Sequence, residues 1–441
     1  MKRLLSLLLC AVLALLCATT AQAAGVSITL TASEYALHYA FDAGAQDPFV
    51  ILEYATPAEK GWMMLYSADG HFEGDVSLAY SGAGGKTTVT LTSARTTGSI
   101  GKTSTTLPKA ADYQKPTGKS NAKVTDFVLT ETPEGFHYAF NAIGTDYMLL
   151  YWRSKEQTVT QPVYPDENGH YEGDVVSELT FARTQFTVQV KSGSGSMKKE
   201  ATVRKGYQAP EAPQRQEGRL SGVTVCIDAG HQENGRFVNE PIGPGLTGST
   251  SGKGGMAQGT KTNRRESIVC LEIGMLLRDE LLRQGANVVM TREDQTTFHT
   301  NIERCEIAEA GGAQIMLRLH CNNSSNRSKR GIQVYGPLNS DYAKAVADAD
   351  TYREMGQKLL DAMKTRVGMT LANSTGMVRL NDNYVGNNWA KMMCFLVEMG
   401  YLSNPAEEYL LVTPVYQQWL AEGMADGVYE IAVARGWVQA Q

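Results

Sequence analysis

The order of apolar and polar residues divides the chain into two regions of different character. From residue 25 to about 115, apolar residues recur at every second position in short runs, such as residues 27–31, 36–41 and 87–92. Turn-rich pieces separate some of these runs, and the region lacks the periodicity of a helix. A period of two is typical of strands with one buried face, so the region is predicted to be all-β.

This all-β pattern occurs twice. Residues 37–43 (LHYAFDA) return as residues 136–142 (FHYAFNA), and residues 70–76 (GHFEGDV) return as residues 169–175 (GHYEGDV). The offset is the same for both pairs, because 136 − 37 and 169 − 70 both give 99. We therefore predict two tandem immunoglobulin-like β-sandwiches, at residues 24–117 and 118–209.

The second recurring segment contains a histidine and a glutamate two positions apart. A His-x-Glu pair can contribute to a metal site, but no third ligand accompanies the pair in this segment. We therefore interpret the segment in both copies as a strand and turn with polar residues on its solvent face. The sandwiches themselves are expected to bind a polymer, to act as a spacer or to contact another protein.

From residue 221 onward, strand-like runs alternate with helical patterns. The predicted strands cover residues 223–229, 287–292, 313–319, 331–335 and 392–397, and the predicted helices cover about 266–285, 302–310, 352–366 and 414–435. This alternation predicts an α/β domain at residues 221–437, with three αβα layers and a mostly parallel or mixed sheet. A polar, proline-bearing linker at residues 210–220 is expected to precede it.

Titratable residues stand at the ends of three of these strands. His231 follows the first strand after a glycine, His320 follows the strand at 313–319, and Glu398 follows the strand at 392–397. Glu266 lies in the first turn of the next helix, on the side that faces the sheet. Because chemistry in open α/β sheets gathers at the carboxyl ends of strands, we expect these groups to meet.

Two histidines and one carboxylate are a familiar ligand set for a catalytic zinc that keeps one position for water. We therefore predict that His231, Glu266 and His320 bind Zn²⁺. Glu398 is the expected acid–base residue, since a carboxylate at the end of a buried strand is costly without a task or a partner. Asp228, just before the turn, is expected to brace the loop or a ligand without binding the metal.

The N-terminus and the composition add three points. A basic start, an apolar stretch and Ala21-Gln22-Ala23 predict a signal peptide at residues 1–23, and hence export or secretion. No other segment suggests a membrane span. The net charge of −5 argues against a nucleic-acid partner. Five cysteines follow the predicted leader, an odd number within apolar patterns, so no disulfide framework is expected.

The motifs of residues 221–435 resemble those of the zinc-dependent N-acetylmuramoyl-L-alanine amidases, a family of cell-wall hydrolases. The matching segments are Val225–His231 (VCIDAGH), Thr291–Asp294 (TRED), Asn301–Arg304 (NIER), Leu319–Asn322 (LHCN) and Val397–Asn404 (VEMGYLSN), together with Glu266. The resemblance implies zinc on His231, Glu266 and His320 and a catalytic Glu398. It implies hydrolysis of the amide between N-acetylmuramic acid and L-alanine in peptidoglycan.

The chain also departs from the family pattern. Ala229 stands where proline is commoner, Arg318 and Cys321 replace smaller residues, and the loop between His231 and Glu266 is long and rich in glycine. These differences bear on substrate preference. Asn322 and Arg379 are candidates for substrate contact.

Two other functions stay open at this point. One is a zinc peptidase or carboxypeptidase acting on wall peptides, and the other is a non-catalytic cell-wall-binding protein. The expected partner is peptidoglycan, with a further contact to a wall polymer or a protein through the sandwiches.

Overall fold

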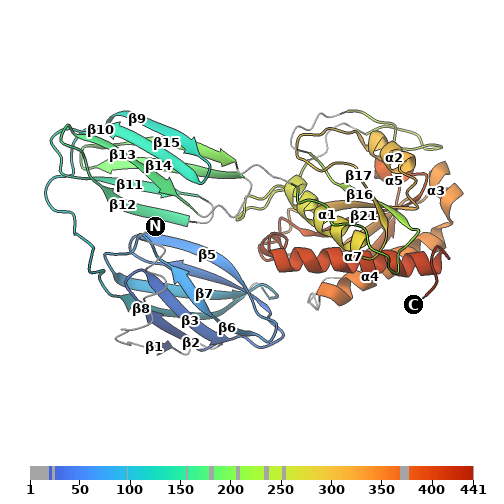
Figure 1. Cartoon of the computed structure of the whole chain (residues 1–441), viewed down its shortest axis with the longest axis horizontal. Helices are drawn as coiled ribbons and strands as arrows, with labels where there is room; N and C mark the ends of the chain where they lie inside the picture. The colour runs from blue at the N-terminus through green and yellow to red at the C-terminus, as the bar shows by residue number, and fades with distance from the viewer. Residues whose placement is uncertain are drawn as a thin grey trace. The chain divides into compact units, whose positions relative to one another are not determined.

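The computed structural model describes residues 19–21, 25–96, 98–154, 157–177, 183–204, 209–232, 238–250, 255–367 and 377–440. The chain divides into two compact units, Met1–Gly206 and Tyr207–Gln441 (Figure 1). Most of the predicted leader at residues 1–23 lies outside the described residues. The part that is described, β1 (Thr19–Ala21), pairs with β2 (Ile28–Ala32) in an antiparallel register.

The first unit consists of strands, as the alternating pattern predicts. In the first copy, β3 (Ala36–Asp42) and β6 (His71–Ser77) extend the sheet of β1 and β2. The opposing sheet contains β4 (Phe49–Ala55), β5 (Glu59–Tyr66), β7 (Gly85–Ser93) and β8 (Ser99–Leu107). Leu30, Phe41, Leu52 and Leu91, from both sheets, are fully or almost fully buried in one core. The copy is thus sandwich-like.

The second copy repeats this arrangement. One sheet contains β9 (Thr125–Thr132), β10 (Gly135–Asn141) and β13 (His170–Val176). The other contains β11 (Met148–Arg153), β12 (Gln157–Val163), β14 (Arg183–Ser192) and β15 (Gly195–Arg204). Its core is more aromatic, since Phe136, Phe140, Trp152 and Phe186 are fully buried.

The two copies share one continuous sheet. Strand β12 of the second copy pairs with β5 of the first, so the eight strands run in the order β15-β14-β11-β12-β5-β4-β7-β8. Glu59 is buried at this junction and accepts hydrogen bonds from the Tyr80 amide (2.9 Å) and, across the two copies, from Gln157 Nε2 (3.0 Å). The sequence pattern did not predict this joint sheet.

The second unit has a six-stranded mixed sheet in the order β17-β16-β18-β21-β19-β20. Its strands are β16 (Thr224–Ala229), β17 (Asn287–Met290), β18 (Ile315–Asn322), β19 (Gln333–Gly336), β20 (Met377–Leu380) and β21 (Met393–Tyr401). β17, β16, β18 and β21 are parallel, whereas β19 is antiparallel to β21. The predicted mixed α/β sheet is thus confirmed.

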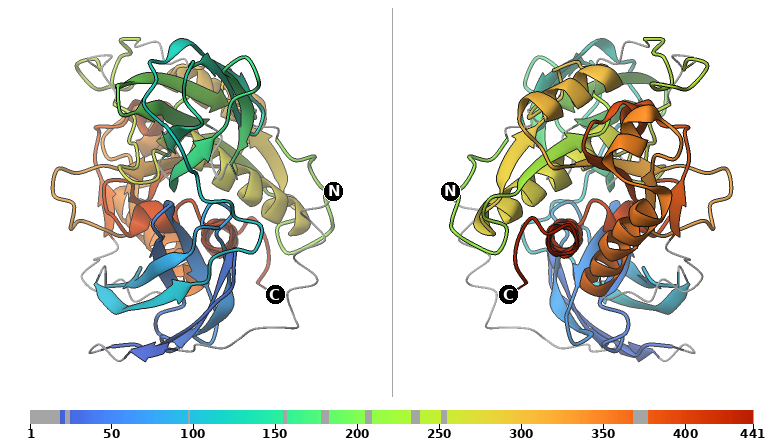
Figure 2. Two further views of the ribbon diagram at one scale, coloured as in Figure 1. Left: turned by 90° about the vertical axis from the view of Figure 1, so that its left-hand side faces the viewer. Right: turned by 90° about the vertical axis from the view of Figure 1, so that its right-hand side faces the viewer.

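Helices cover both faces of this sheet. Helices α1 (Glu266–Arg283), α4 (Ala349–Val367) and α7 (Pro414–Ala434) lie on one face, and α7 packs beside α4 (Figures 1 and 2). The other face carries α2 (Asn301–Ala310) and α5 (Val385–Trp389), with α3 (Asp341–Val346) against α5. The short α6 (Glu407–Leu410) contacts β21. Among the described residues, no helix is long and apolar enough to cross a membrane.

Side chains on the α2 face of the sheet change character toward the carboxyl ends of the strands. The first layer is apolar, with Cys226, Met316 and Cys394 in one cluster against α2 and α5. Two residues further on, Asp228 stands beside Arg318 in the parallel register, and both are buried. A further two residues place His320 beside Glu398. Alternation along the strands therefore places a charged layer between the apolar core and the predicted site.

The segment predicted as a linker is bound to the second unit. Arg278 Nη2 donates to the Pro210 carbonyl oxygen (2.8 Å), Arg215 Nη1 donates to that of Gly285 (2.9 Å), and the Leu220 amide donates to that of Gln284 (2.8 Å). These residues thus run along α1 and its C-terminal turn. The five cysteines after residue 221 are all buried and unpaired, in agreement with the expectation of no disulfide framework.

Candidate metal centre

The predicted ligands come from three neighbouring elements that end at the same edge of the sheet. His231 lies two residues beyond the end of β16, His320 lies in the adjacent β18, and Glu266 is the first residue of α1. Their ligand atoms all lie within 4.8 Å of one another. The structure therefore brings together residues that are far apart in the sequence.

Glu266 is the centre of this group. Its Oε1 lies 2.9 Å from His320 Nδ1 and 3.2 Å from His231 Nε2. The Cys321 amide donates to Oε1 (3.0 Å), and the Ala257 amide donates to Oε2 (2.7 Å). These backbone donors fix the carboxylate between the two imidazoles.

The protonation states suit metal binding. Burial works against the charge of Glu266, but hydrogen bonds from His231 and His320 outweigh it, so the pKa of Glu266 is lower than usual. Burial, as the largest cause, lowers the pKa of His320, which favours its neutral form. His320 Nε2 is buried and has no hydrogen-bond partner among the described residues. One carboxylate and two imidazoles, one of which has a buried nitrogen with no hydrogen-bond partner among the described residues, fit a divalent ion such as zinc.

Glu398 lies beside these ligands without joining them. It pairs with His320 in the register of β18 and β21, and its Oε2 is buried without a hydrogen-bond partner in the part of the chain that the structure describes. Burial, with a smaller effect from the charge of Glu266, raises the pKa of Glu398 to about 8. A carboxyl group with a pKa near neutrality can both accept and return a proton.

Two buried arginines hold the backbone that carries His231. Arg292 donates to the carbonyl oxygens of Ala229 (Nε, 2.7 Å) and Gly230 (Nη2, 2.9 Å). Arg304 donates to those of Ala229 (Nη1, 3.0 Å) and His231 (Nη2, 3.2 Å). His231 has a φ of 57°, a conformation that is unfavourable for a residue with a side chain. We infer that these bonds to three consecutive carbonyls maintain this conformation.

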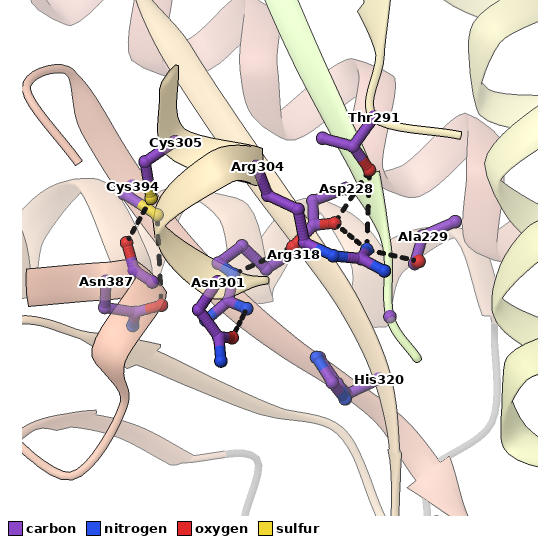
Figure 3. Close-up of polar contacts among 12 residues, drawn as sticks. Asp228, Ala229, Thr291, Asn301, Arg304, Cys305, Arg318, His320, Asn387 and Cys394 are labelled. Carbon is purple, nitrogen blue, oxygen red and sulfur yellow. Dashed lines mark hydrogen bonds and ion pairs between the residues drawn. The ribbon is translucent and has the colours of Figure 1, made fainter. Parts of the chain in front are cut away.

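Asp228 connects the arginines beneath the site. It is fully buried and accepts hydrogen bonds from Thr291 Oγ1 (2.8 Å), Arg318 Nε (2.9 Å) and Arg304 Nη1, as Figure 3 shows. Arg318 also donates to Asn301 Oδ1 (2.7 Å) at the start of α2. Burial opposes the charge of Asp228, but Arg304 and Arg318 outweigh it and hold the pKa of Asp228 far below its usual range. Asp228 therefore contacts Thr291, Arg304 and Arg318 and is not among the three candidate ligands; the bracing role expected from its position before the turn stays a prediction.

The network continues into the loop that follows β16. Glu240 in that loop is buried and accepts hydrogen bonds from Asn301 Nδ2 (2.7 Å) and from the Ile302 amide (2.8 Å). Asn388 Nδ2 donates to the Ile242 carbonyl oxygen (2.9 Å), which attaches the loop to α5. Residues 238–250 of the long loop are therefore attached to α2 and α5 through Glu240 and Ile242.

A cavity of about 820 Å³ opens at this edge of the sheet. Its lining includes the three candidate ligands, Glu398, and wall residues from the loop and from α2 such as Glu240 and Asn301. The candidate metal ligands, Glu398 and the loop residues thus line one space, whose volume is in the range of small-molecule sites.

Comparison with known proteins shows which family the sequence around this site matches. A sequence model of the family described as N-acetylmuramoyl-L-alanine amidase matches residues 225–430. Residues 225–430 form a domain of this amidase family. The matched residues include every candidate ligand and Glu398, and they exclude the sandwiches.

Two curated relatives are similar to this domain. The germination-specific N-acetylmuramoyl-L-alanine amidase of Bacillus subtilis is 26% identical over 231 residues, which are 49% of this chain and 83% of the relative. The probable cell wall amidase LytH of Staphylococcus aureus is 27% identical over 218 residues, which are 48% of this chain and 60% of the relative. The chain therefore spans less than two thirds of LytH.

Solved structures of amidases also match about half of the chain. The N-acetylmuramoyl-L-alanine amidase of Clostridium difficile 630 is 24% identical, with a TM-score of 0.38, and the match covers 48% of this chain and 96% of that one. Ami1 of Mycobacterium smegmatis is 18% identical, with a TM-score of 0.43, and the match covers 49% of this chain and 100% of that one.

Two further residues of the amidase domain were candidates for substrate contact. Asn322 lines the cavity, and its Nδ2 donates to Gln333 Oε1 (3.1 Å). Arg379 lies exposed on β20 and is not among the described residues that line the cavity. The sequence analysis did not assign roles to Arg292 and Arg304, although both stand within segments that resemble the family.

Proposed function

We propose that the chain is an exported, zinc-dependent peptidoglycan hydrolase that cleaves the amide between N-acetylmuramic acid and L-alanine. The observation that carries the proposal is the convergence of His231, Glu266 and His320 in one cavity with Glu398, whose buried Oε2 has no hydrogen-bond partner among the residues that the structure describes. The family match and the cell-wall relatives support the substrate.

The chain's residues have distinct tasks in this reaction. His231, Glu266 and His320 would hold zinc. When bound, zinc polarises a carbonyl and makes water acidic enough to lose a proton near neutral pH. Glu398 accepts a proton from the attacking water, whose oxygen bonds to the lactyl carbonyl carbon. Glu398 then gives the proton to the alanine nitrogen as the carbon–nitrogen bond breaks. The products are a muramic acid carboxylate and a free alanine amine.

The test compares Glu398→Gln with His231→Ala on purified peptidoglycan. Glu398→Gln keeps the size of the side chain and the metal ligands, so we expect it to retain zinc while turnover falls by roughly 10²–10⁴-fold. His231→Ala should lose both zinc and activity. The measurements are the zinc content of each protein and the release of new N-terminal alanine with and without chelator. Full activity of Glu398→Gln, or of the chelated wild type, would contradict the proposal.

A zinc peptidase would instead release a C-terminal residue from the stem peptide, and a non-catalytic binder would sediment with peptidoglycan without releasing a product. The same incubation separates these alternatives, because the two enzyme reactions expose different ends of the peptide.

We also propose that the leader at residues 1–23 directs export and that the sandwiches are immunoglobulin-like modules that contact a wall polymer or a protein. The two-sheet arrangement that both copies share supports the module assignment. N-terminal sequencing of the mature protein should start at Ala24. Deletion of residues 25–206 should weaken co-sedimentation with walls. An N-terminus at Met1, or unchanged sedimentation, would count against these assignments.

A further inference from the structure

The two segments that recur in the sequence meet on the outer face of each sandwich. In the first copy, the antiparallel register of β3 and β6 sets His38 opposite Asp75 and Asp42 opposite His71, with Glu73 between them. In the second copy, the register of β10 and β13 repeats the arrangement with His137, Asp174, Asn141, His170 and Glu172. The structure thus supplies the third candidate ligand that each His-x-Glu segment lacked.

In the first copy, Glu73 lies between two imidazoles. Its Oε1 is 3.3 Å from His38 Nε2, and its Oε2 is 3.8 Å from His71 Nε2. The other ring nitrogens face further carboxylates, His38 Nδ1 at 3.0 Å from Asp75 Oδ1 and His71 Nδ1 at 2.7 Å from Asp42 Oδ1. Each imidazole is therefore held at Nδ1 and presents Nε2 to the same glutamate.

The second copy has nearly the same geometry. Glu172 Oε1 is 3.1 Å from His137 Nε2, and Oε2 is 3.9 Å from His170 Nε2. His137 Nδ1 lies 2.9 Å from Asp174 Oδ1, and His170 Nδ1 lies 2.7 Å from Asn141 Oδ1. The one substitution, from Asp42 to Asn141, keeps an oxygen acceptor at Nδ1.

In a neutral imidazole, this geometry would place two hydrogen-bond acceptors, Nε2 and a glutamate oxygen, next to each other. Because an oxygen faces Nδ1, a neutral imidazole carries its hydrogen there, and its Nε2 is left as a lone pair. That lone pair points at a carboxylate oxygen, so the contact is repulsive unless a proton or a metal cation lies between them. An oxygen acceptor at Nδ1 is also the usual partner of a histidine that binds a metal through Nε2.

Packing explains only part of the recurrence. A Cβ on Gly74 would lie 2.8 Å from Tyr39 Oη, and one on Gly173 would lie 2.7 Å from Tyr138 Oη, so each tyrosine ring requires its glycine. The histidines and carboxylates project outward, where packing does not constrain them. Strands β5 and β12, by comparison, differ throughout when aligned at their first residues (EKGWMMLY and QTVTQPV). Both copies therefore retain exposed polar residues that packing does not require.

We propose that each sandwich binds one divalent transition-metal ion of the zinc class through the two Nε2 atoms and the glutamate between them. Tetrahedral zinc with ligands at 2.0–2.1 Å separates them from one another by about 3.3 Å. The contacts of His38 and His137 already match this spacing. His71 and His170 contact the other carboxylate oxygen, at 3.8 and 3.9 Å. Among the described residues, only the amidase-domain group has its ligand atoms all within 4.8 Å of one another, so metal binding in the sandwiches requires the exposed imidazoles to turn toward each other around the glutamate.

The experiment measures how much zinc the full chain binds. Metal-free protein is equilibrated against buffered zinc, and the bound metal is determined by mass spectrometry. We expect about three ions per chain, one in the amidase domain and one in each sandwich. His231→Ala should lose one ion, and Glu73→Gln and Glu172→Gln should each lose one other. Glu53→Gln, on the exposed face of β4, is the matched control and should lose none.

The wild type gives a second readout that does not depend on folding of a variant. Zinc should shift the Nε2 resonances of His38 and His137 in the nitrogen-15 spectrum of the full chain. Glu73 is 59% exposed, so its glutamine variant should melt like the metal-free wild type. The proposal fails if His231→Ala binds no zinc, if both glutamine variants bind as much as the wild type, or if the imidazoles are protonated at pH 7.5 and unchanged by zinc. The amidase assay reads out independently of all three results.

Discussion

Replacement of Asp228 by asparagine tests the charged layer beneath the amidase site. The side chain keeps its size, and its oxygen can still accept from Thr291 and Arg304. Its new amide group, however, faces Arg318 Nε, which now lies 2.9 Å from a carboxylate oxygen. Two donors, the new amide group and Arg318 Nε, then face each other. The buried guanidinium groups of Arg304 and Arg318 also lose the negative charge that they share.

Breaking a buried ion pair at one partner costs about 3–5 kcal/mol. Because two of the three hydrogen bonds survive, we expect a value at the lower end, about 3 kcal/mol, which is roughly a 10²-fold change in an opening equilibrium. The full chain has two compact units, so its global unfolding is not a single transition. Hydrogen exchange of the β16 and β18 amides, measured by mass spectrometry, reports on the amidase domain alone.

The direction in which folding shifts the pKa of Asp228 determines the pH at which exchange should be measured. The pKa of Asp228 is lower in the folded chain than in the unfolded one, so the ion pair contributes fully above the unfolded value of about 4 and is lost as the pH falls toward the folded value. Exchange at pH 7 therefore measures the whole effect. Thr291→Val is the control, since it removes one hydrogen bond and should cost about 1 kcal/mol. Exchange of Asp228→Asn within threefold of the wild type, or an equal loss in the control, would refute the reasoning.

Three further substitutions have defined outcomes. Gly274→Ala should stabilise α1 by about 1 kcal/mol, because the added Cβ would lie 3.5–3.6 Å from its nearest neighbours, at ordinary van der Waals distance. Slower hydrogen exchange in α1 would confirm this, and faster exchange would contradict it. Gly386→Ala should destabilise the domain by about 1–3 kcal/mol, because the added Cβ would overlap the Arg318 guanidinium, which hydrogen bonds hold in place. Hydrogen exchange at the wild-type rate would show instead that this guanidinium can move. Burial raises the pKa of Glu59, so the folded first unit binds this proton more tightly and should lose stability as the pH rises from about 4.5 through the folded pKa. Glu59→Gln should flatten this dependence in thermal melts from pH 4.5 to 8, since the Gln157 amide can turn to accept; an unchanged slope would show that another group causes it.

The sequence predicted the parts of the fold that depend on local pattern. Alternating apolar residues placed three strands of the first sandwich, β2, β3 and β7, within a few positions, and the apolar run before His231 placed β16. The convergence of His231, His320 and Glu398 was predictable because parallel strands end at one edge of a sheet. The position of Glu266 followed from the helical period of α1.

Long-range pairing was not predictable in the same way. Residues that form β12 and β5 have no pattern that selects one as the partner of the other, because the edge of any sheet offers free backbone groups. The sequence pattern likewise does not show that β19 runs antiparallel to β21. Arg292 and Arg304 stand among polar residues and resemble solvent-exposed positions, and only the fold shows that they bind the carbonyls around His231. The polar cluster on each sandwich likewise depends on strand register, which joins two segments that the sequence shows only as separate repeats.

The bond that the protein cleaves tests the central claim most directly. A defined disaccharide–peptide from peptidoglycan is incubated with the zinc-loaded full chain, and the products are identified by mass spectrometry. The account predicts an intact disaccharide with a free lactyl carboxylate and an intact stem peptide with a free N-terminal alanine, and neither product with Glu398→Gln. A disaccharide that keeps L-alanine, with a shortened peptide, would contradict it.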